Sequence, residues 1–180
     1  DVSSSVDVQT RFGLPQALER SLIVASRISK ARSLDELWQG WEVTPAAVTV
    51  RSALKRLTQW QHISGEDQTG AAFPGMTDRV LERIKATPKD GGSWLDVAKN
   101  ETNRHLLTKD CLRRWNARDF GSHPDIYGRM WLDRPAPTIK RECSHLGNGR
   151  YAHPTEDRLL TVREMATLQG FPFDFQFSSA

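Results

Sequence analysis

This 180-residue chain contains 25 lysine and arginine side chains, and their chemistry is that of anion recognition. A guanidinium or ammonium group attracts phosphate, and the planar guanidinium also suits a base carbonyl. The net charge is only +3, but the pI near 9.1 lets a modest clustering of base make one face attractive to phosphate. The basic candidates for nucleic-acid contacts are Arg20, Lys140, Arg141, Arg158 and Arg163.

Each of these residues also has a structural interpretation. Arg20 can pair with Glu19 or another acid at the surface, and the segment after Pro137 can be a solvated turn. Arg158 and Arg163 flank the expected start of a helix, where they can hold phosphate or brace the fold through neighbouring acids. The sequence leaves both interpretations open.

Cysteine and histidine do not form a recognisable site. Cys143 and His145, even with His105 and Cys111 upstream, match no familiar zinc spacing, and the sequence has no CxxC pair. We therefore expect no metal, no disulfide framework and a reduced, intracellular setting. No apolar run approaches the roughly 18 to 20 residues that cross a bilayer, so no membrane partner is predicted.

The elements that position these residues are clearest at the two ends of the chain. Residues 22–25 (LIVA) form a short apolar run that predicts a strand buried on both faces, as in a parallel sheet. The sequence shows no neighbouring strand for it. Together with the start at Asp1, this favours a piece of something longer, or the smaller half of a two-part protein.

The spacing of apolar residues predicts helices over 49–57, capped by Thr49, and over 77–86. Residues 94–157 are predicted to be irregular loops with a few short strands, 127–131 being one candidate. Near the C-terminus, Thr161 and Glu164 form a capping box, and Gly170 suits the end of a helix of about two turns.

Three segments together resemble the DNA cytosine-5 methyltransferase family. Residues 12–20 (FGLPQALER), with the strand that follows, are similar to the eighth motif of that family. Residues 158–172 (RLLTVREMATLQGFP) are similar to the ninth motif almost position for position. Residues 127–131 and 133–139 resemble the segment that leads out of the family's variable target-recognition region.

The resemblance implies an α+β fold: a small, irregular mixed target-recognition domain, plus one strand contributed to the parallel sheet of a Rossmann-like methyltransferase domain that is mostly absent. The implied division places the eighth-motif turn and strand at 1–30, the target-recognition region at 31–157, and the ninth-motif helix and tail at 158–180.

By resemblance, Arg20 matches an arginine that points at the nucleotide rotated out of the duplex, a supporting catalytic role. Leu18 stands where the family usually has another arginine, which removes one donor from the implied site. The resemblance also implies DNA contacts at Gln16, in the eighth-motif turn, and at Thr138, which matches a threonine that contacts the DNA backbone. In the middle region, side chains of the types that read base edges are available. They are Arg104, Arg113, Arg114, Asn116 and Arg118, although a basic loop facing solvent is an equal interpretation.

The family's Pro-Cys nucleophile, Glu-Asn-Val motif and Gly-rich cofactor loop do not occur in this sequence. The resemblance therefore implies that S-adenosyl-L-methionine is bound mainly by a missing catalytic half, and that this chain alone is inactive. The expected partners are that half and double-stranded DNA, in a bacterial cytoplasm or a eukaryotic nucleus. The alternatives are a non-catalytic DNA-binding or regulatory module derived from such an enzyme, and an unrelated helical DNA binder, for which no helix-turn-helix pattern is evident.

Overall fold

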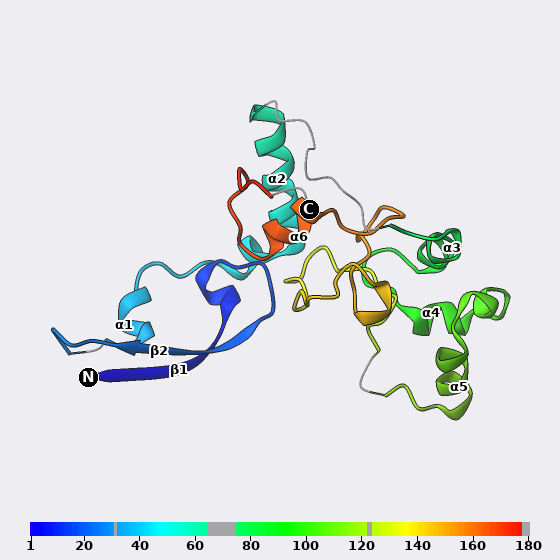
Figure 1. Ribbon diagram of the computed structural model, residues 1–180, viewed down its shortest axis with the longest axis horizontal. Helices are drawn as coiled ribbons and strands as arrows, with labels where there is room; N and C mark the ends of the chain where they lie inside the picture. The colour runs from blue at the N-terminus through cyan, green and yellow to red at the C-terminus, as the bar shows by residue number, and fades with distance from the viewer. Residues whose placement is uncertain (31, 65–74, 122–123, 178–180) are drawn as a thin grey trace.

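The computed structural model describes residues 1–30, 32–64, 75–121 and 124–177, and it has the predicted α+β composition. In chain order its elements are β1 (Val2–Val8), the 3-10 helix η1 (Gln9–Phe12), β2 (Glu19–Ala25), α1 (Leu34–Trp38), η2 (Pro45–Val48), α2 (Val50–Ser64), α3 (Asp78–Ala86), α4 (Trp94–Lys99), η3 (Glu101–Leu106), α5 (Lys109–Ala117), η4 (Leu146–Asn148) and α6 (Val162–Leu168). Figure 1 shows the β1–β2 hairpin on one side, α2 and α6 at the centre, and α3, α4 and α5 gathered on the opposite side.

The hairpin contains the predicted strand, but its surroundings differ from the prediction. β1 and β2 pair antiparallel, in a register that runs from Val2 opposite Ala25 to Val8 opposite Glu19. β1 was not predicted from the sequence, because serines interrupt its apolar residues. The prediction that β2 is buried on both faces is wrong within this chain, since Ile23 is 72% exposed.

The centre of the molecule is organised by α2 and α6, which pack against each other. Thr49 caps α2 as predicted, with its Oγ1 accepting from the Ser52 N–H at 3.2 Å, although the helix extends beyond the predicted residue 57. The capping box of α6 is also confirmed. The main core contains Val50, Ala53, Ile84, Met130, Ala136, Ile139, Leu146, Tyr151, Ala152, Leu159, Leu160, Met165 and Leu168.

The predicted helix α3 is present, but the prediction of irregular structure after residue 94 is wrong for α4, η3 and α5. Two side-chain caps explain why these helices form. Ser93 and Asp96 make a reciprocal capping box at the start of α4, and Thr108 Oγ1 accepts from the Cys111 N–H at 3.2 Å at the start of α5. These helices enclose a second core of Trp94, Val97, Ala98, Leu107 and Cys111.

The rest of the region from residue 124 to the start of α6 is irregular, as predicted, apart from η4. The candidate strand at 127–131 is wrong as an extended strand, because only Arg129 pairs there, in an isolated parallel bridge with Ala152. Hydrogen bonds from the buried side chains of Arg129 and Arg150 to main-chain carbonyls hold these loops in place of a sheet. Among the described residues, no helix is both long and apolar enough to span a bilayer.

Candidate nucleic-acid interface

The buried side chain of Gln16 joins three segments that are far apart in sequence. Its Oε1 accepts from the main-chain N–H of Ile139 at 3.1 Å, and its Nε2 donates to the carbonyl of Leu168 at 3.5 Å. Only 2% of Gln16 is exposed, so this polar group depends on those partners. The turn after η1, the stretch at 136–139 and the end of α6 therefore meet at one amide.

Main-chain hydrogen bonds reinforce the same joint. Ala17 N–H donates to the Ala136 carbonyl at 2.7 Å, and Ala136 N–H donates to the Pro15 carbonyl at 2.9 Å. Thr138, one of the predicted site residues, donates its hydroxyl to the Ala17 carbonyl at 3.2 Å. The fold thus places Thr138 beside the Gln16 turn, at the half-buried edge of the joint.

Arg20 lies apart from this joint, on β2 of the hairpin. It is exposed, stands opposite Asp7 in the strand register, and donates from Nη1 to the main-chain carbonyl of Glu19 at 3.0 Å. This bond leaves the guanidinium at the surface, where it can meet an anion.

Lys140 and Arg141 follow the joint on an exposed loop. Arg141 is 91% exposed and pairs with Glu142 at 2.9 Å, a surface contact of little energetic weight. A groove of about 370 Å³ runs beside this loop, and Lys140 and Glu142 face Arg114 of α5 across it. Lys140 also lines an adjoining hollow of about 150 Å³ together with Thr138. The structure therefore brings Thr138 and Lys140 to one groove.

Arg158 is held internally by acids. Its guanidinium donates to both carboxylate oxygens of Glu164, at 2.7 and 2.8 Å, and to those of Glu156, at 2.8 and 3.2 Å. Burial works to lower the pKa of Arg158, but the hydrogen bonds to Glu164 and Glu156 outweigh it and raise the pKa above its usual value. Glu164 is thus a partner of Arg158, whereas the neighbouring acid Asp157 binds Arg129.

Arg163 is also engaged inside the protein. It is only 6% exposed, and its Nη1 donates to the carbonyls of Phe173 and Phe175 at 2.8 and 2.5 Å. Its guanidinium lies 5.3 Å from the ring centroid of Phe177. Arg163 thus ties the C-terminal tail to α6.

Two further arginines, Arg129 and Arg150, organise the loops and were not singled out from the sequence. Arg129 is fully buried, and its guanidinium reaches five acceptors, four of them carbonyls and one the carboxylate of Asp157. Arg150 is 6% exposed, pairs with Asp125 at 2.6 Å and lies 3.8 Å from the ring centroid of Trp131. No local pattern predicts such roles, because the acceptors come from distant loops.

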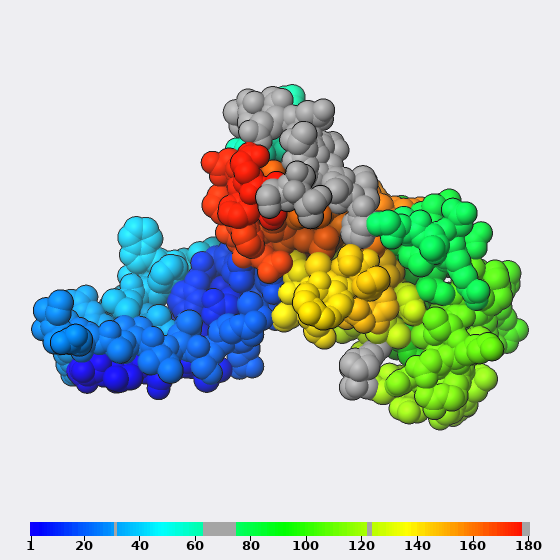
Figure 2. Space-filling view, in the orientation of Figure 1, coloured from blue at the N-terminus to red at the C-terminus, as the bar shows by residue number. Residues whose placement is uncertain are grey.

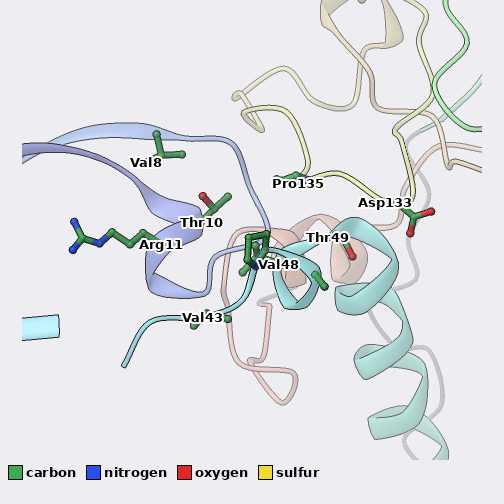
Figure 3. A pocket seen from close by; sticks show the side chains of 10 residues that line it. Val8, Thr10, Arg11, Val43, Val48, Thr49, Asp133 and Pro135 are labelled. Carbon is green, nitrogen blue, oxygen red and sulfur yellow. The ribbon is translucent and has the colours of Figure 1, made fainter. Parts of the chain in front are cut away.

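A separate groove of about 450 Å³ lies between the hairpin turn, the segment around η2 and the stretch 133–135, as Figure 3 shows. Its walls are mostly apolar. Its carboxylate, Asp133, is bound by Arg51 through contacts of 2.6 and 2.8 Å, which lower the pKa of Asp133. Rossmann-type sites that bind an adenosine group use a free carboxylate for the ribose hydroxyls and a Gly-rich turn at a helix N-terminus. This groove does not fit S-adenosylmethionine.

Comparison with known proteins agrees with the resemblance. Type II methylase M.HgiDII of Herpetosiphon aurantiacus is 32% identical over 179 residues, which are 98% of this chain and 46% of that protein. Type II methyltransferase M.AquIB of Picosynechococcus sp. is 44% identical over 117 residues, 65% of this chain and 61% of that protein. No solved structure matches the chain.

The chain thus spans about half the length of M.HgiDII and less than two thirds of M.AquIB. Putative type II methyltransferase M.MJ0563P of Methanocaldococcus jannaschii is 55% identical over 108 residues, 54% of this chain and 30% of that protein. The model of the C-5 cytosine-specific DNA methylase family matches residues 2–180. This chain belongs to the C-5 cytosine-specific DNA methylase family.

Proposed function

We propose that this chain is the DNA-recognition part of a DNA cytosine-5 methyltransferase, and that it acts inside the cell with a catalytic half that it does not itself contain. The observation that carries this proposal is the joint at Gln16, which unites the three segments that resemble motifs of the family. Contact at one point between segments so far apart in sequence is what a shared site requires.

The proposed junction with the catalytic half is the β1–β2 hairpin. Val2, Val6 and Val8 on β1 are 66%, 63% and 45% exposed, and Ile23 on β2 is 72% exposed on the same face of the sheet. An apolar face of this kind is usually covered by another layer of protein. A chain that spans about half of a relative's length leaves enough protein to cover it. We assign residues 1–30 to this junction, residues 31–157 to the target-recognition region, and residues 158–180 to the ninth-motif helix and the C-terminal tail.

Methylation of cytosine at carbon 5 in a duplex requires the base to leave the stack, so the protein must hold a distorted backbone. We assign this work to three exposed cations, Arg20 toward the displaced nucleotide and Lys140 and Arg141 toward phosphate, and to the half-buried hydroxyl of Thr138, also toward phosphate. Gln16, Arg158 and Arg163 support these positions from inside the fold.

S-adenosylmethionine supplies the methyl group in this family, and we assign its binding to the catalytic half. Two observations support this assignment: the sequence lacks the family's Gly-rich cofactor loop, and the carboxylate of the groove at Asp133 is already bound by Arg51.

Complementation tests the proposal. The chain is mixed with a catalytic half that carries the Pro-Cys and Glu-Asn-Val motifs, and transfer of a labelled methyl group from S-adenosylmethionine to duplex DNA is measured. We expect transfer only in the mixture. Duplex binding without transfer in any mixture would instead favour a non-catalytic DNA-binding module, an alternative to which Leu18 points because it replaces a donor.

A further inference from the structure

We infer that the exposed side of α5 enters the major groove and reads base edges, with Arg113, Asn116 and Arg118 as its specificity-determining residues. This inference rests on the proposed function and deepens it, because it names the element that would distinguish one DNA sequence from another.

One side of α5 is fixed in the protein and the other faces solvent. Cys111 is 1% exposed and Trp115 packs against the same core, which holds the helix rigidly. Lys109, Arg113 and Asn116 are exposed and recur at i, i+4 and i+7, so they form one stripe along the helix. Arginine pairs with guanine and asparagine with adenine through two hydrogen bonds each. The stripe therefore presents the side-chain types that read bases.

The charge of α5 favours DNA. The acid of the helix, Asp110, bonds to Arg113 at 2.7 Å and to Arg114 at 2.8 Å, which lowers the pKa of its carboxyl. Contacts of this exposed kind are weak and exchange readily for a ligand. Within the part of the chain that the structure describes, Lys109 and Arg118 make no ion pair. The exposed surface of α5 therefore keeps two cations that pair with no acid among the described residues.

Arg118 adapts the end of α5 to this role at a conformational cost. It has φ 53° and ψ 25°, a left-handed conformation that glycine adopts more easily at the end of a helix. The side chain stands beside a hollow of about 420 Å³ that it lines with Trp115, Asn116 and Phe120, and Phe120 is 40% exposed. The end of the helix thus places the Arg118 side chain beside Asn116.

The position of α5 agrees with the proposed DNA face. The groove beside Lys140 is lined on its other side by Asp110 and Arg114 of α5. Figure 2 shows the loop around Lys140 and the segment that contains α5 on the same face of the molecule. The helix of 9 residues is about 13 Å long, and the major groove, about 12 Å wide, admits a helix. Phosphate contacts at Lys140 and base contacts from α5 can therefore be made together.

Selection from a randomised duplex library by the full chain tests the inference, followed by measurement of affinity for the selected sequence and for scrambled DNA. In Asn116→Ala and in Arg113→Lys, which keeps the charge but loses the planar fork, we expect discrimination at particular base pairs to fall about tenfold or more. Affinity for scrambled DNA should change by less than about twofold, since few phosphate contacts are lost. Arg118→Gly should also weaken sequence preference, without unfolding the helix.

Two control variants separate reading from attraction. Lys140→Ala should weaken binding to all sequences alike, and Arg56→Ala, an exposed arginine on α2, should change neither property. The inference is overturned if Asn116→Ala and Arg113→Lys keep the full preference of the unaltered chain, or if that chain binds DNA with no preference. Failure of the unaltered chain to bind any duplex would instead refute the proposed function, and the inference with it.

Discussion

The buried arginines Arg129 and Arg163 and the exposed arginines at α5 have opposite surroundings. Arg129 is fully buried and reaches five acceptors, and Arg163 is 6% exposed. Arg113 and Arg118 are exposed, and the contact of Arg113 is to a neighbouring acid on its own helix. We therefore assign the proposed DNA surface to the basic residues whose guanidinium groups are not already saturated by the protein.

Removal of an arginine whose hydrogen bonds are all made inside the protein should have the largest effect on the free energy of unfolding. Arg129→Ala removes the buried donor that the Asp157 carboxylate and four carbonyls share, so we expect the free energy of unfolding to fall by about 3–5 kcal/mol. Chemical denaturation measures this change. Arg113→Ala, the matched exposed variant, should change it by less than about 0.5 kcal/mol. Equal losses in the two variants would remove the distinction between the two regions.

Removal of the buried amide of Gln16 should have the second largest effect on the free energy of unfolding. Gln16→Leu leaves the Ile139 N–H without its acceptor, and we expect a loss of about 1–3 kcal/mol in the free energy of unfolding. Hydrogen exchange at the Ile139 amide should accelerate in the same variant. Asn116→Ala, an exposed amide on α5, is the control, and a loss in Asn116→Ala as large as that in Gln16→Leu would contradict the role given to the joint.

Acid should weaken the loop region through His153. Its Nδ1 accepts main-chain N–H groups of Thr155 and Glu156 at 3.3 and 3.0 Å, and Glu156 and Glu164 face its Nε2. Burial, and then the nearby Arg158, lower the pKa of His153 against the opposing effect of those acids. A lowered pKa means that the folded state binds this proton less well than the unfolded chain.

The stability that His153 contributes is therefore complete above its unfolded pKa of about 6.5 and is lost as the pH falls through the lower, folded pKa. Denaturation midpoints measured from pH 7.5 down to pH 5 should decline in the unaltered chain. They should decline less steeply in His153→Gln, and parallel curves for the two proteins would contradict this role. The exposed α5 region has no histidine and should not contribute to the decline.

The smallest effect, of opposite sign, is expected at the end of α5. Arg118→Gly relieves the left-handed backbone at φ 53° and should raise the free energy of unfolding by about 0.5–1 kcal/mol. Thermal denaturation measures the gain. Arg113→Gly, in the interior of the same helix, should instead destabilise by a similar amount. A loss of stability in Arg118→Gly would show that its side chain supports the fold.

Elements with strong local signals could be predicted from the sequence. The capping box at Thr161 and Glu164 defined α6, and Thr49 marked the start of α2, because a side-chain oxygen beside an apolar repeat satisfies free N–H groups. The same Ser-x-x-Asp signal at Ser93 and Asp96 could have found α4. Capping residues therefore predict the helices between residues 94 and 157 better than the overall composition of that region does.

Features that depend on distant partners could not be predicted. The partner of β2 is β1, whose exposed valines face away from the rest of the chain, and the acceptors of Arg129 come from separate loops. The resemblance identified Gln16 as a site residue, but only the structure shows that its amide links two other segments.

Salt dependence of duplex binding by the unaltered chain tests the central claim most directly. Neutralisation of phosphates by lysine and arginine releases counterions, so the logarithm of the association constant should fall linearly with the logarithm of salt concentration. We predict a clear negative slope that becomes shallower by about one in Lys140→Ala. Binding that is undetectable, or that does not respond to salt, would contradict a DNA-recognition role for this chain.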